Sequence, residues 1–77
     1  MEIYGQPITC HPHDYVWIMA RLKELPNKQL LSAVIRKYSE VYKRSMIRLD
    51  LQATGDARRE ANTRLRKYIK NQLRAYT

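Results

Sequence analysis

Apolar residues recur along the chain in three helical stripes, and the first follows fourteen residues that have no apolar period. Its spacings of three and four positions are typical of an amphipathic helix. The members of this stripe are Tyr15, Ile18, Met19, Leu22 and Leu25. Pro26 ends the stripe, because the residue before a proline avoids the helical region. The pattern predicts a helix over residues 14–25, with Asp14 as its N-cap.

The second and third stripes predict two long helices, over residues 27–53 and 56–76. Pro26 suits the first turn of the second helix, where its missing N–H has no cost. Gly55 fits the left-handed position after a helix, and Asp56 suits the cap of the next one. The alternative is a single rod that contains the glycine, at a cost of about 1 kcal/mol.

Together the stripes predict an all-α fold in one domain over residues 1–77. The two long helices form an antiparallel hairpin, because their connection is short. The short helix packs on this hairpin. Residues 1–13 are predicted to form an irregular arm, since Gly5, Pro7 and Pro12 interrupt them and no apolar period runs through them.

The predicted core gives only marginal stability, because the chain is short. It consists of Val16, Ile18, Met19, Leu22, Leu25, Leu31, Val34, Ile35, Tyr38, Val41, Tyr42, Met46, Leu49, Leu65, Ile69 and Leu73. At this size the burial of apolar surface roughly balances the entropy of ordering the chain. Long helices also leave flanks that a short first helix does not cover. We therefore expect a homodimer.

Charge changes the picture because it is unevenly distributed. Fifteen Lys and Arg against seven Asp and Glu give a net charge of +8. Residues 1–28 are balanced, so the whole excess belongs to residues 29–77, which hold twelve basic and four acidic residues. A basic surface attracts polyanions, above all nucleic acids, although a solvated helix face or an acidic protein partner explains the same composition.

The third predicted helix carries most of the candidate binding residues. Arg58, Asn62, Arg66, Lys70 and Arg74 recur every four residues, with Arg59 and Lys67 beside them, and Lys37, Arg44 and Arg48 come from the second helix. Four of the cations, Arg58, Arg66, Lys70 and Arg74, are predicted to neutralise phosphates, with Asn62 as a base contact. A helix-turn-helix unit joins short helices by a tight turn, whereas both helices beside Gly55 are long. We therefore expect binding mainly through phosphates and not through sequence-specific contacts.

Other functions are weaker interpretations of the sequence. An interaction module that docks its helical hairpin on a larger, acidic protein is the main alternative. Catalysis is not predicted, because no nucleophile–base arrangement, glycine-rich loop or carboxylate pair stands out, and no cofactor is predicted. Cys10, His11 and His13 form a minor candidate metal site, although a structural zinc site normally needs two separated pairs of ligands.

The aromatic residues are six tyrosines and one tryptophan, without phenylalanine. Most of the tyrosines fall on the helical stripes, where core or interface positions are more typical than stacking on bases. Trp17 lies off its stripe and is the better candidate for an exposed contact.

The expected cellular compartment follows from features that the sequence lacks. A single cysteine needs no oxidising environment, no apolar window is long enough to span a membrane, and residues 1–10 do not resemble a signal peptide. We expect a cytoplasmic protein without membrane contact.

The stretch ARREANTRLRKYI, from Ala57 to Ile69, resembles small helical accessory proteins of bacteriophages and other mobile elements. The resemblance covers about a sixth of the chain. It implies an accessory role in a phage or prophage module, and it assigns no role to any single residue.

Overall fold

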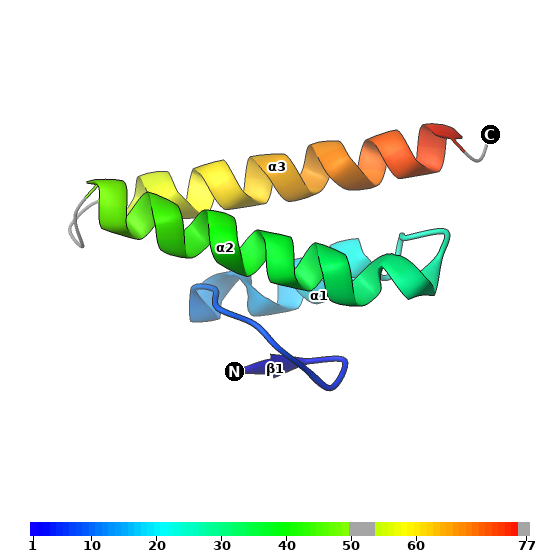
Figure 1. The fold of residues 1–77 in the computed structure, drawn as a ribbon, viewed down its shortest axis with the longest axis horizontal. Coiled ribbons are helices and arrows are strands. Elements are labelled where there is room, and N and C mark those ends of the chain that lie inside the picture. The colour runs from blue at the N-terminus through cyan, green and yellow to red at the C-terminus, as the bar shows by residue number, and fades with distance from the viewer. Residues whose placement is uncertain (50–53, 76–77) are drawn as a thin grey trace.

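The computed structural model describes residues 1–49 and 54–75, without the side chains of residues 48, 49 and 54. Its helices are α1 (Tyr15–Leu22), α2 (Leu31–Leu49) and α3 (Thr54–Ala75). Figure 1 shows α2 and α3 running antiparallel and side by side, with α1 and the N-terminal segment on one side of the pair. The predicted all-α hairpin with a short first helix is therefore confirmed. The predicted helix ends at residues 53 and 76 lie outside the described residues.

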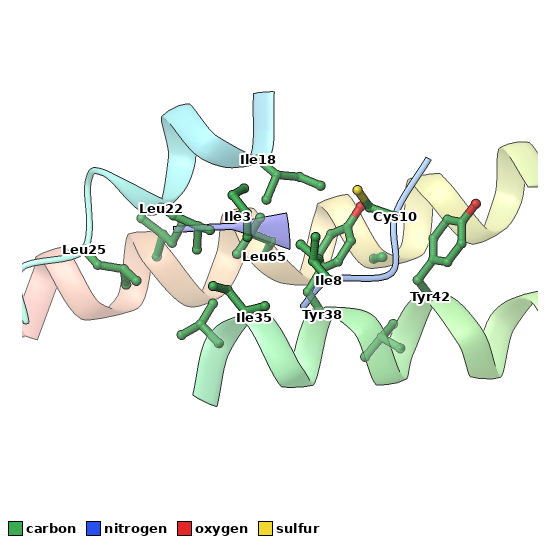
Figure 2. Packing of buried hydrophobic residues seen from close by; sticks show 14 of the residues in the cluster. Ile3, Ile8, Cys10, Ile18, Leu22, Leu25, Ile35, Tyr38, Tyr42 and Leu65 are labelled. Atoms are coloured by element: carbon green, nitrogen blue, oxygen red, sulfur yellow. The ribbon is translucent and has the colours of Figure 1, made fainter. Parts of the chain in front are cut away.

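The N-terminal arm is more ordered than predicted. Residues Glu2–Ile3 (β1) and Gln6–Pro7 (β2) pair as antiparallel strands. Tyr4 and Gly5 join them with positive φ angles of 51° and 77°, the backbone that a two-residue hairpin turn needs. Figure 2 shows Ile3 and Ile8 pointing into the space between the helices, and both are buried. Strands of two residues are too short to produce an alternating pattern of apolar and polar residues, so no such period was detectable.

Two predicted helix boundaries are wrong by a few residues. The first helix ends at Leu22, because the last turn closes with i→i−3 hydrogen bonds from Glu24 N to Arg21 O and from Leu25 N to Leu22 O. The second was predicted to begin at residue 27, but it begins later. Asn27 is extended, and its side chain accepts a hydrogen bond from Gln29 N at 2.9 Å. A 3₁₀ turn, η2 (Lys28–Leu30), then leads into α2.

Gly55 does not occupy the predicted left-handed position. It lies in the first turn of α3, which begins at Thr54, and its φ is not in the positive range. The two long helices are thus separate, as predicted, but Gly55 belongs to α3 and does not follow the end of α2 directly. Asp56 lies in the same turn, where its negative charge complements the helix dipole.

The core lies where four elements meet, namely strand β1 and helices α1, α2 and α3 (Figure 2). Ala57 and Ala61 are 0% and 1% exposed, so α3 packs closely through small side chains in its first half. Two predicted core residues are wrong: Val16 is 75% exposed and Leu73 is 39% exposed. The side chain of Leu49 lies outside the described part. Within the described residues, no helix is both long and apolar enough to cross a membrane.

Candidate nucleic-acid interface on α3

The orientation of each side chain on α3 follows from the helical rotation of about 100° per residue. A residue four positions on is therefore turned by about 40° relative to the first. The buried stripe of Ala57, Ala61, Leu65 and Ile69 defines the inner face. The predicted binding residues at four-residue spacing form a row, which we call the predicted ridge: Arg58, Asn62, Arg66, Lys70 and Arg74. This ridge starts beside the buried stripe and turns by about 160° along the helix. Only its C-terminal part faces away from the core.

Arg58 is used inside the fold. Its Nε and Nη2 atoms donate to the two carboxylate oxygens of Asp14, at 2.9 and 3.0 Å, in a bidentate ion pair. The Asp14 side chain is 10% exposed and that of Arg58 is 32% exposed. Hydrogen bonds from Arg58 hold the pKa of Asp14 below its ordinary value of 3.8, against the opposing effect of burial. The ion pair fixes the start of α1 to the second turn of α3.

This role of Asp14 differs from the predicted helix cap. Its side chain makes no capping hydrogen bond, and its backbone is already helical at φ −94° and ψ −7°. The reason is the preceding 3₁₀ turn, η1 (Pro12–Asp14), which continues directly into α1. The Tyr15 N–H therefore donates to Pro12 O, and the carboxylate of Asp14 is left to pair with Arg58.

Asn62 also takes part in this internal network. Its Oδ1 accepts a hydrogen bond from the hydroxyl of Tyr38 on α2, at 2.5 Å. Its amide further lowers the pKa of Asp14, while burial raises the pKa of Tyr38. The side chain predicted to contact a base thus links α2 to the Asp14–Arg58 pair, and its Oδ1 is already engaged.

Trp17 lies next to α3 and is partly buried against the core. The guanidinium carbons of Arg21 and Arg66 lie 5.9 and 5.6 Å from the centre of its ring. These are cation–π distances. The ring predicted as an exposed stacking contact is therefore occupied by two arginines, one of which, Arg66, is itself exposed and belongs to the predicted ridge.

The remaining candidates share one surface, which we name the outer face of α3. Its members are the exposed residues Arg59, Arg66, Lys67, Lys70 and Arg74. All five fall within about 100° of arc on the side opposite the buried stripe. Lys37 and Arg44 are exposed on α2, and Lys37 shares a groove with Lys67. The side chain of Arg48 lies outside the described residues.

The candidate metal ligands near the N-terminus are engaged elsewhere. Cys10 is buried, its thiol lies 3.6 Å from the Met1 sulfur, and burial raises its pKa. His11 Nδ1 accepts a hydrogen bond from His13 N at 3.1 Å, and the two rings meet edge to face at 4.8 Å. Over residues 1–49 and 54–75, no three His, Cys, Asp or Glu side chains are grouped as metal ligands would be.

One feature of this surface was not predicted from the sequence. The partnership of Asp14 with Arg58 joins residues 44 positions apart, so no local pattern indicates it. The outer face of α3, in contrast, follows from the angular position of each residue once the buried stripe is known.

Comparison with protein-family models, with curated proteins and with solved structures finds no match to this chain.

Proposed function

We propose that this protein binds nucleic acid through the outer face of α3, mainly by neutralising phosphates. The observation that supports this most is the clustering of five exposed cations on one arc of a single helix. From Arg59 to Arg74 the arc spans fifteen residues, or about 22 Å at 1.5 Å per residue. No acidic residue lies on the arc between these two positions.

Phosphate-led binding suits the chemistry of this surface better than reading of base edges. Arg58 and Asn62 hold the fold together, which removes the proposed base contact and one proposed phosphate contact. The residues that remain are arginines and lysines alone, which recognise charge and leave sequence unread. We propose that such a protein acts as an accessory factor that covers or bridges nucleic acid.

The proposal predicts a steep dependence of affinity on salt. Binding of labelled single- and double-stranded DNA and RNA is measured by fluorescence anisotropy between low and physiological salt. With about four phosphate contacts, the slope of log K against log salt is expected near −3.6 for duplex DNA and near −2.8 for single strands. Absence of binding to every oligonucleotide at low salt would contradict the proposal.

A matched pair of double variants tests whether the outer face is the site. Arg59→Gln with Lys70→Gln removes two exposed charges from the outer face, and we expect the duplex slope to fall by about 1.8. Arg36→Gln with Lys43→Gln removes the same charge from α2, on the side near β2. Equal loss of affinity in both double variants would show that net charge alone attracts the nucleic acid.

A further inference from the structure

The side of the α2–α3 hairpin away from the Asp14–Arg58 pair carries an open groove of about 500 Å³. Its apolar surface comes from both helices, including Ala33 and Val41 of α2 and Leu65 and Tyr68 of α3. Tyr68 is 37% exposed, although it lies on α3 beside Leu65, which is buried. Apolar surface between two packed helices is typical of a site that receives a third helix.

The rim of the groove is positively charged. Lys37, Arg64 and Lys67 line it, and none of the described residues that line it is acidic. Arg64 lies 3.5 Å from Glu60, one turn earlier on α3, with 63% of its side chain exposed. An i,i+4 pair with one exposed partner contributes only about 0.3–0.5 kcal/mol, so an incoming carboxylate can compete for Arg64.

The covered side of the same hairpin shows which kind of segment fits such a surface. There α1, an amphipathic helix of eight residues, buries Ile18 and Leu22 against the hairpin. The carboxylate of Asp14, directly before α1, pairs with Arg58 on α3. An apolar helix stripe combined with a carboxylate–arginine pair is thus the recognition that this hairpin already uses once.

We propose that the open groove between α2 and α3 binds a short amphipathic helix of a partner protein that carries acidic residues beside its apolar stripe. On α2 the groove extends from Ala33 to Val41, about 12 Å at 1.5 Å per residue. This length accommodates two turns of helix with apolar anchors at positions i, i+4 and i+7. The inference does not depend on the nucleic-acid proposal, because the outer face and the groove have only Lys67 in common.

A second copy of the chain is a poorer occupant of this groove. The solvent-facing sides of α2 and α3 are rich in Lys and Arg, and the whole chain carries a net charge of +8. Pairing two hairpins through the groove places these cations opposite the cationic rim, and like charges brought together oppose association. An acidic segment has the complementary charge.

The binding test uses two designed fluorescent peptides of about fourteen residues, long enough for the two turns that the groove accommodates. Both carry leucines at i, i+4 and i+7, one with flanking glutamates and the other with lysines at the same places. We expect the acidic peptide to bind the full-length protein at least about tenfold more tightly, since only its charges complement the rim. Equal affinity for the two peptides would overturn the proposal.

Variants then locate the peptide on the protein. Ala33→Trp places a large side chain in the groove from an exposed position, and we expect about a tenfold loss of affinity for the acidic peptide. Lys37→Glu with Arg64→Glu reverses two rim charges and should have a similar effect. Arg36→Glu with Lys43→Glu makes the same charge change on the other side of α2 and should change affinity less than about threefold. Equal losses in the two charge-reversed proteins would overturn the proposal.

Two further measurements distinguish a partner helix from a second copy of the chain and from a nucleic acid as the occupant of the groove. If sedimentation shows a dimer that Ala33→Trp dissociates, a second copy fills the groove and the proposal is wrong. If Ala33→Trp weakens oligonucleotide binding as strongly as Arg59→Gln with Lys70→Gln, the groove is part of the nucleic-acid site and the proposal is again wrong. Retention of peptide binding by the Arg59/Lys70 double variant supports two independent sites. Circular dichroism confirms that each variant is folded.

Discussion

The two ends of α3 carry similar residues and use them in opposite ways. Near the start, Arg58 and Asn62 bond to Asp14 and Tyr38 and join three segments of the chain. Near the end, the cations at the same four-residue spacing, Lys70 among them, are exposed. The cause is the rotation of about 40° that accumulates with each step of four residues. Residue type and spacing alone therefore do not separate a structural arginine from a binding one, whereas the angle to the buried stripe does.

The largest expected effect comes from comparing one residue type in the middle and near the end of α3. Leu65 is 4% exposed and Leu73 is 39% exposed. Leu65→Ala is expected to lower the free energy of unfolding by about 2–5 kcal/mol, because it leaves a cavity. Leu73→Ala is expected to change it by about 0.5 kcal/mol or less. Urea unfolding followed by circular dichroism measures both, and equal losses would mean that the end of α3 is buried in solution.

The next effect concerns the ion pair at the start of α3. Asp14→Ala removes a bidentate, charge-assisted interaction and should lower the free energy of unfolding by about 2 kcal/mol. Asp56→Ala is the matched control, since Asp56 is an exposed acid in the first turn of α3 and contributes about 0.5 kcal/mol through the helix dipole. Arg58→Gln should destabilise in the same direction as Asp14→Ala, and Arg59→Gln should not. Similar unfolding midpoints for the Asp14 and Asp56 variants would contradict a structural role for the Asp14–Arg58 pair.

The same pair predicts how stability depends on pH. Arg58 lowers the pKa of folded Asp14 below 3.8, whereas the unfolded chain titrates near 3.9. The unfolded state therefore takes up the proton first, so the contribution of Asp14 is complete at neutral pH. It is lost as the pH falls below about 4 and through the pKa of the folded state. The stability difference between wild type and Asp14→Ala should shrink on acidification, and a constant difference from pH 6 to pH 3 would contradict an electrostatic origin.

The sequence predicted the helices better than their ends. Three apolar stripes with proline and glycine between them were sufficient for the hairpin and the short helix, because helical periodicity is a strong local signal. The boundaries depend on weaker choices, such as the 3₁₀ turn Lys28–Leu30 and the inclusion of Gly55 in α3. The N-terminal strands, with two residues each, leave no period in the sequence.

The candidate site was predictable in its composition and less so in its members. The basic character of the last helix is visible in the sequence, and all five exposed cations of the outer face were among the predicted residues. The internal use of Arg58 depends on Asp14, which lies 44 positions away, and a pairing at that distance is set by tertiary packing. The groove depends on which side of the hairpin α1 leaves uncovered, and no single apolar stripe in the sequence indicates that side.

The smallest effect tests the link between α2 and the start of α3. Tyr38→Phe removes the hydroxyl that donates to Asn62 Oδ1 at 2.5 Å and should lower the free energy of unfolding by about 1 kcal/mol. Tyr68→Phe is the control, because Tyr68 is 37% exposed at the groove and the loss of its hydroxyl should change stability by about 0.5 kcal/mol or less. If Tyr38→Phe were as neutral as Tyr68→Phe in urea unfolding, Asn62 would not be held by the network, and it would again qualify as a contact to a nucleic-acid base.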